Sequence, residues 1–386
     1  MEVDASPALA AQRRAHPELE ESIAELEKYA STKLYHQLTE ALLKYLKSPP
    51  LLPASAAAEL LDFFNGFVRP YEKKFDKVKW VQMLSIVCKT QEAEKALALI
   101  EPFEASMEKD REAKYLWQIL KAEKQTQAGQ FDAAKELLDV LGKEIDEAYE
   151  VPALIQSELQ RANAQLWKKL ERPQDFYKAS ILYLAFTPLA SIPAAERPRL
   201  AFEVGAAALV APEEFNFGEL LQQELLGSLD GSEYAWIKDL LKAFGEGKFD
   251  LFDGAVSTHR AKIDSTPELK AAVDTVLRPK MCALALMELA FRKPKKQRRL
   301  TFAEVAEHCR VGPKDVEMLV MKSMCAGLIK GQIDEVNQIV MVTWVKPRIL
   351  DTVRIDLMRE RMDAWGAQTG LLLEHLEEMT PELLVS

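Results

Sequence analysis

The sequence predicts an all-α chain of stacked helical hairpins that ends in a small α+β module and one last helix. Apolar residues recur at steps of three and four from about residue 29 to residue 290, with little of the alternation that indicates strands. A hairpin pattern repeats within this region, and the rhythm changes near residue 293. At 386 residues, 48% hydrophobic and with only 15 Gly, the chain can bury a core without disulfides or metals.

The first clear helix lies near the N-terminus. Leu34, Leu38, Leu42 and Leu46 form one apolar stripe at helical spacing, and the stripe stops at the Ser-Pro-Pro run of residues 48–50. We expect the residues before this region, 1–28, to be flexible.

An internal echo indicates a helical repeat. Residues 129–134 (GQFDAA) and 247–252 (GKFDLF) both place a Gly turn and an aromatic residue between two helical stretches, and residues 175–179 (DFYKA) are a weaker copy. The Gly lets the chain leave the first helix in a left-handed conformation, and the aromatic residue packs into the next hairpin. The pattern predicts a right-handed solenoid similar to tetratricopeptide repeats, with an irregular helical bundle as the alternative.

The residues after the basic, proline-broken run 292–299 predict a winged helix. Residues 301–304 (TFAE) form a capping-box signature that opens a helix, and Gly312-Pro313 starts a second helix. Two short β runs follow, residues 328–333 and 339–344. Two helices followed by a hairpin within about fifty residues are typical of this module.

The C-terminal segment predicts a helix that binds a partner. Its apolar residues follow alternating steps of three and four if Thr369 fills one position, which is the pattern of a bundle or coiled-coil seam. Gly366 and Gly370 interrupt the pattern, and each costs a helix interior about 1 kcal/mol relative to Ala. We therefore expect partners to order this helix. The stripe consists of Ile355, Met358, Met362, Trp365, Leu372, Leu376 and Met379.

The residues that catalysis or metal binding would need are not in a suitable pattern. The five histidines are scattered without an HExxH motif, and no Walker loop is present. Residues 245–248 (GEGK) are expected at a helical turn. Cys309 and Cys325 fall on apolar sides of adjacent predicted helices, where we expect buried, inert thiols. We therefore predict no catalytic residue, no cofactor, no metal and no small-molecule substrate.

The net charge of -10 repels nucleic acid and anionic membranes. On the second predicted helix of the winged helix, the charges of Lys314, Asp315, Glu317 and Lys322 cancel. This helix is therefore poorly suited to bind the phosphates of nucleic acid. Neither a secretion signal nor a membrane span is recognisable. We expect an intracellular protein without nucleic-acid or membrane partners. The run 292–299 is either a nuclear-import or nucleic-acid patch or a solvated loop facing an acidic neighbour.

Helical repeats followed by a winged helix resemble the PCI family, whose members occur in the proteasome lid, the signalosome and translation initiation factor three. Several segments are similar in particular to subunits of the lid: residues 33–39, 215–221, 300–306, 316–322, 327–336 and 343–350. The resemblance implies a non-catalytic scaffold subunit of the 19S regulatory particle lid, in the cytoplasm and nucleus, that takes part in degradation of ubiquitinated proteins. It also implies winged helices joined edge to edge and C-terminal helices gathered in a bundle.

On this basis we predict a helical-repeat arm at residues 29–170, a PCI domain at 171–346 and a bundle helix at 347–386. The PCI domain divides into a helical part, 171–292, and a winged helix, 293–346. The alternatives are a PCI subunit of the signalosome or of the initiation factor, or a winged-helix nucleic-acid binder. The predicted interface with other lid subunits consists of Ile333, Ile339, Met341, Met358, Met362, Trp365, Leu372 and Leu376.

Overall fold

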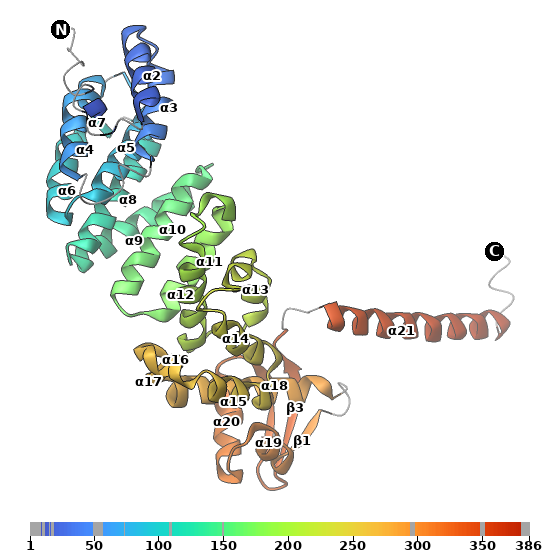
Figure 1. Ribbon diagram of the computed structural model, residues 1–386. Coiled ribbons are helices and arrows are strands. Elements are labelled where there is room, and N and C mark those ends of the chain that lie inside the picture. The colour runs from blue at the N-terminus through green and yellow to red at the C-terminus, as the bar shows by residue number, and fades with distance from the viewer. Residues whose placement is uncertain are drawn as a thin grey trace. The chain divides into compact units, whose positions relative to one another are not determined.

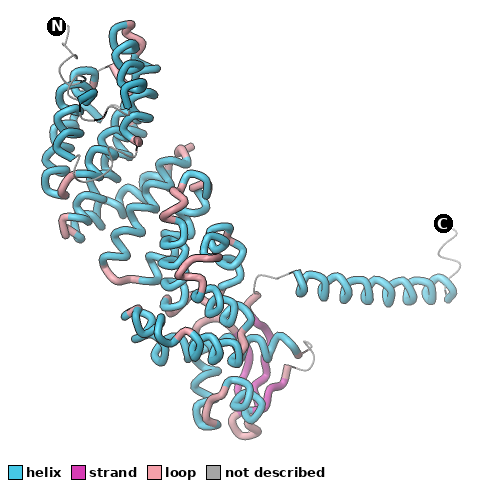
Figure 2. The backbone as a smooth tube through the Cα atoms, in the orientation of Figure 1, coloured by secondary structure: helices cyan, strands magenta, loops and turns pink. Residues whose placement is uncertain are grey.

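The computed structural model describes residues 19–48, 57–72, 74–107, 110–148, 150–293, 298–347 and 352–379, together with residues 9, 12–14 and 16. The described chain is mostly helical (Figure 1), and its strands all fall within residues 299–345 of the sequence (Figure 2). The chain forms two compact units, Met1–Ile192 and Pro193–Ser386. The predicted fold class is confirmed.

Unit one is a series of helices that pack as successive hairpins. Residues 20–28, part of the segment expected to be flexible, lie in helix α2 of this unit, in which Ile23 and Leu26 are buried. The main helices are α2 (Glu20–Ser31), α3 (Tyr35–Leu46), α4 (Ala57–Phe63), α5 (Lys77–Thr90), α6 (Ala93–Ile100), α7 (Glu104–Met107), α8 (Arg111–Gln127), α9 (Phe131–Glu147), α10 (Ala153–Lys169) and α11 (Pro173–Phe186).

The predicted stripe of α3 faces the core of unit one. Leu38, Leu42 and Leu46 are buried, and the helix ends at Leu46, just before the Ser-Pro-Pro run. Leu34 is exposed because it precedes the helix as its N-cap residue.

The turns of the hairpins use left-handed residues, as the repeat pattern predicts. Gly129 has φ 83° between α8 and α9, and Glu171 has φ 53° between α10 and α11. At the second turn, the amide of Arg172 donates to the carbonyl of Trp167 at 3.0 Å, which closes the end of α10. The same local geometry therefore reverses the chain at both positions.

A buried charge network joins α8 to α10. Arg161 on α10 donates to Glu123 on α8 at 3.1 Å and pairs with Glu158 at 2.5 Å. Glu123 is buried, and its neighbour Lys124, also buried, donates to Gln127 at 2.9 Å. Such pairs add little net stability, but each partner requires the other because an unpaired buried charge is costly.

Unit two contains the rest of the helical region, the three strands and the C-terminal helix. Its elements are α12 (Arg197–Val210), α13 (Phe217–Gln222), α14 (Trp236–Glu246), α15 (Phe249–Thr258), α16 (Arg260–Ser265), α17 (Pro267–Ala272), α18 (Arg278–Arg292), β1 (Arg299–Thr301), α19 (Phe302–Cys309), α20 (Val316–Cys325), β2 (Ile329–Asp334), β3 (Ile339–Val345) and α21 (Thr352–Met379).

The helix α18 is buried on nearly all sides. The residues from Lys280 to Glu288 are all buried, as is Ala290. A helix that is apolar all round requires neighbours on every face. Helix α14 and the segment Val273–Leu277 of the helical part pack on α18, and so do α19, α20 and β3 of the winged helix. The winged helix is thus built onto the last long helix of the helical region.

The Lys280 side chain of α18 caps the C-terminus of α12. Its amine donates to the carbonyls of Ala208 at 2.8 Å, Leu209 at 3.3 Å and Ala211 at 2.7 Å. These are carbonyls that a helix end leaves without intrahelical partners. The amine also lies 4.8 Å from the ring centroid of Phe217 on α13. With the residue only 3% exposed, burial lowers the pKa of Lys280 to about 7, although Glu214 opposes this shift.

We predict that Lys280 makes unit two more stable as the pH rises above 7. Between pH 7 and 10.5 the unfolded chain binds a proton that the folded amine has lost, so the free energy of unfolding rises with pH. The slope from this group approaches about 1.4 kcal/mol per pH unit and is lost in Lys280→Met. Urea unfolding of both proteins from pH 7 to 9.5 measures the difference, with the exposed Lys314→Met as control. Parallel profiles for the wild type and Lys280→Met would contradict it.

Candidate interaction surfaces

The sheet of the winged helix has three strands in the order β1-β3-β2, all antiparallel. The two predicted β runs are present as β2 and β3, but the short strand β1 was not predicted. Because β1 pairs with β3, the strand that carries Ile339 and Met341 is the central strand of the sheet. The longer of the two outer strands is β2.

Strand pairing sorts the predicted interface residues onto two faces. Residues opposite each other on neighbouring strands share a face. Val340 is buried and pairs with Leu300 and Ile333, so Ile333 lies on the face toward the core. Ile339 and Met341 alternate with Val340 and lie on the opposite face, where both are half-buried. The structure thus brings Ile339 and Met341 together and separates them from Ile333.

A bulge between β2 and β3 requires a glycine. The pairing shifts between Lys330 and Gly331. A Cβ on Gly331 would lie 2.1 Å from the carbonyl oxygen of Met341 and 3.1 Å from the Cα of Val342, both backbone atoms. Next to the bulge, the exposed Trp344 ring lies 5.1 Å from the amine of Lys330. The exposure of Trp344 was not predicted from the sequence.

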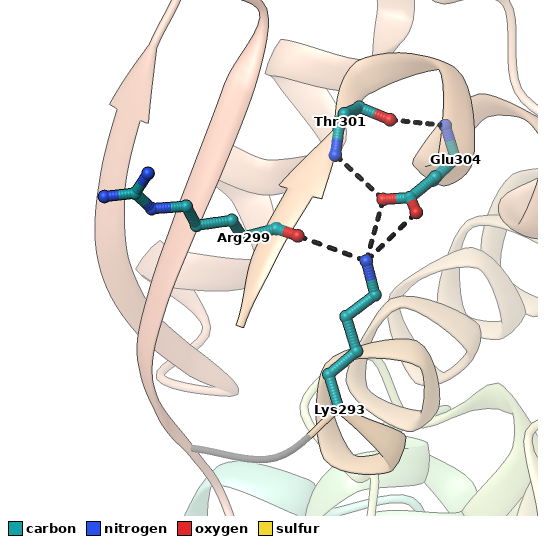
Figure 3. A network of polar contacts seen from close by, with 4 residues as sticks. All are labelled: Lys293, Arg299, Thr301 and Glu304. Carbon is teal, nitrogen blue, oxygen red and sulfur yellow. Dashed lines mark hydrogen bonds and ion pairs between the residues drawn. The ribbon is translucent and has the colours of Figure 1, made fainter. Parts of the chain in front are cut away.

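The start of the winged helix is held by the predicted capping box. The amide of Glu304 donates to the Thr301 hydroxyl at 3.2 Å, and the Thr301 amide donates to the Glu304 carboxylate at 3.0 Å. Lys293 donates to the same carboxylate at 2.9 Å and to the Arg299 carbonyl at 3.1 Å, while the Arg299 side chain points away (Figure 3). The hydrogen bonds from Lys293 and then from Thr301 lower the pKa of Glu304.

The basic run contacts the chain itself through several of its members. Besides Lys293, Arg292 donates to Glu288 at 3.3 Å, and Arg298 donates to the Lys293 carbonyl at 3.3 Å. The centre of the run, residues 294–297, lies outside the described residues.

The outward face of α20, the position of a recognition helix, is apolar at its centre. Met318 and Met321 are exposed there, while Val316 and Val320 face the core. Cys325 is also exposed, so the expectation that it is buried was wrong. It lies seven residues after Met318, which in a helix returns it to nearly the same face.

The other thiols are buried, and burial makes them weak acids. Cys309 is buried as predicted, and burial raises its pKa to about 12. The same effect raises the pKa of Cys88 to about 12. The thiolate is the nucleophile, so neither residue has the environment of a reactive cysteine.

The helix α21 exposes the predicted apolar stripe. It continues as one helix through Gly366 and Gly370. Thr369, in the polar position of the stripe, donates its hydroxyl to the Trp365 carbonyl at 2.8 Å. Every described side chain of α21 is exposed, with Trp365 at 69%. The exposed stripe consists of Ile355, Met358, Met362, Trp365, Leu372, Leu376 and Met379.

Within the described residues, no group of three His, Cys, Asp or Glu side chains is arranged to hold a metal ion. None of the described helices is both long and apolar enough to span a membrane. The motif at residues 245–248 forms the end of α14 and a left-handed turn at Gly247, as expected.

Comparison with known proteins yields matches along nearly the whole chain. Residues 22–241 match the family described as PSD13 N-terminal repeats, and residues 260–344 match the PCI domain. The chain is 30% identical to the 26S proteasome non-ATPase regulatory subunit 13 of Dictyostelium discoideum over 95% of both chains. It is 30% identical to the 26S proteasome regulatory subunit RPN9 of Saccharomyces cerevisiae over 94% of both chains. Eukaryotic translation initiation factor 3 subunit M of Aspergillus terreus matches only 46% of the chain, at 28% identity.

We predict that Gly331→Ala disrupts the hairpin of β2 and β3. The added Cβ meets backbone atoms that cannot rotate away, so the strands must separate at the bulge, at a cost of about 1–3 kcal/mol. Thermal unfolding together with hydrogen exchange of the β2 amides measures the effect.

The matched control is Gly254→Ala on α15, where a Cβ meets nothing within 4 Å. We expect this change to be neutral or to stabilise the helix by about 1 kcal/mol. Equal behaviour of the two variants would show that the close approach at Gly331 does not constrain the sheet.

Proposed function

The chain belongs to the family of 26S proteasome non-ATPase regulatory subunit 13, and we propose that it acts as a structural subunit of the lid of the 19S regulatory particle. In this role it scaffolds lid assembly and thereby supports ATP-dependent degradation of ubiquitinated proteins. The observation that carries the proposal is the match to such subunits over 95% of the chain. A PCI subunit of translation initiation factor three is the weaker candidate, since the subunit M match spans less than half of the chain.

The shape of the exposed surfaces supports a role in assembly. A helix as long as α21 that leaves Met362 and Trp365 exposed to water would bury its apolar stripe in a bundle with other helices. We therefore propose that Met358, Met362, Trp365, Leu372 and Leu376 contact helices of other lid subunits.

The winged helix is proposed as a second contact with lid subunits. Ile339 and Met341 offer an apolar face, while Ile333 belongs to the outer strand β2, whose free side can pair with a strand of a neighbour. Residues 29–170 are proposed as the helical-repeat arm, 171–346 as the PCI domain and 347–386 as the bundle helix.

We propose that the subunit carries out no chemistry and requires no cofactor, small-molecule substrate, nucleic acid or membrane. The raised pKa values of the buried thiols and the balanced charges on α20 support this view. The proposed location is the cytoplasm and nucleus, where 26S proteasomes act.

We predict that Trp365→Asp combined with Leu372→Asp reduces incorporation into the lid by at least tenfold, because two carboxylates would be buried in the bundle. Tagged variants expressed beside the untagged wild type are captured and their lid subunits quantified by mass spectrometry. Ala364→Asp with Ala367→Asp is the control, since it adds the same charge to α21 on the side of the helix away from the stripe and should incorporate normally. Circular dichroism of each purified variant checks that the fold is intact.

Ile339→Asp with Met341→Asp should reduce incorporation into the lid less than the α21 variant does, because these two side chains are already half-buried on the open face of the sheet. We predict that this variant weakens a lateral contact and dissociates from the lid at lower salt than the wild type. Normal incorporation and normal salt resistance of both interface variants would refute the assignment of these surfaces.

A further inference from the structure

Arg310 connects the winged helix to the α14–α15 hairpin of the helical part. It follows α19, and its guanidinium pairs with two carboxylates, Asp250 and Asp253, that lie one turn apart on α15. The guanidinium carbon also lies 5.6 Å from the ring centroid of Phe249. We call this contact of Arg310 with Asp250 and Asp253 the Arg310 clamp.

The backbone at Arg310 is one that glycine adopts at lower cost. Arg310 has φ 52° and ψ 45° and ends α19, where the Val311 amide donates to the Ala306 carbonyl at 3.1 Å. This is the helix ending in which Gly predominates, because a side chain in the left-handed region costs about 1–2 kcal/mol. If the position served only to stop the helix, Gly would suit it better. Because Glu171 and other non-Gly residues of this chain also adopt positive φ, a role for the Arg310 side chain rests on its contacts.

The Arg310 contact lies at the surface, so its main effect is on orientation rather than on stability. The Arg310 side chain is 44% exposed and that of Asp250 is 88% exposed, and pairs of this kind add only about 0–1 kcal/mol. A forked guanidinium held by two carboxylates nevertheless fixes direction in a way that a single charge does not. The clamp thus orients the elements it joins more than it stabilises either one.

The clamp spans a cleft between these elements. A cavity of about 550 Å³ is bordered by the turn at Gly247, by Asp250 and Arg310, and by Leu289 of α18 and His308 of α19. Helix α18 packs closely on α19, whereas its packing against α14 is less extensive. The α14–α15 hairpin packs mainly on α12 and α13, and across the cleft the Arg310 clamp joins it to the winged helix.

We propose that Arg310 is a positioning residue that holds the α14–α15 hairpin against the winged helix and so fixes the direction in which the sheet meets a neighbouring subunit. The claim that Arg310 directs the sheet toward a neighbouring subunit rests on the proposed function. The claim that Arg310 holds the α14–α15 hairpin concerns the isolated chain and is tested without the lid.

Hydrogen exchange of the full chain tests the clamp. Arg310→Gly should speed exchange of residues 246–253 about fivefold, the effect expected for losing a contact of about 1 kcal/mol. Asp250→Asn with Asp253→Asn should give the same increase, and the triple variant no further increase. Arg310→Lys, which keeps the charge but not the fork, should lie between the wild type and Arg310→Gly. The thermal midpoint of Arg310→Gly should stay within about 3 °C of the wild type.

Two results would overturn the clamp. One is wild-type exchange at residues 246–253 in Arg310→Gly, which would leave Arg310 as a helix stop only. The other is a uniform increase across α19 and α20, which would indicate a loosened winged helix rather than a freed hairpin.

The role of Arg310 in assembly is tested by competition between Arg310→Gly and the wild type for incorporation into the lid. We expect the variant to be incorporated about threefold less, or lower still. Faster exchange with full incorporation would overturn the positioning role. Failure of the wild type itself to incorporate would instead count against the proposed function, while the exchange result would still decide whether the clamp exists.

Discussion

The burial of α18 is the constraint on which unit two depends. This helix packs against α14 in the helical part and against α19, α20 and β3 in the winged helix. The winged helix therefore cannot be removed without exposing an apolar face. Lys280 ties the same helix to the end of α12, where its amine satisfies three carbonyls that would otherwise lack partners. A polar amine on a buried helix thus serves to fix how two helices meet.

The surfaces that remain exposed follow from this arrangement. With α18 covering one face of the sheet, Ile339 and Met341 are left on the other face, and β2 is left as an outer strand. The outward face of α20 carries Met318 and Met321 where a reader of DNA would carry cations. Together with the stripe on α21, these features are typical of a subunit whose partners are proteins.

Much of this organisation could be predicted from the sequence, because it depends on local patterns. The stripe of α3, the left-handed turn at Gly129 and the capping box at Thr301 are each set by residues within a few positions of one another. The features that were missed depend on distant residues. Strand β1 has only three residues and forms because β3, about forty residues later, pairs with it. The partners of Lys280 and Arg310 lie more than fifty residues away in the sequence, so no local pattern indicates them.

The most direct test of the scaffold role is affinity purification of the tagged wild-type chain from cells at moderate salt, with mass spectrometry and a peptidase assay on the eluate. We expect the other lid subunits to co-elute with the peptidase activity of the 20S core. Elution with signalosome or initiation-factor subunits in their place, or with bound nucleic acid and no lid subunits, would contradict the account.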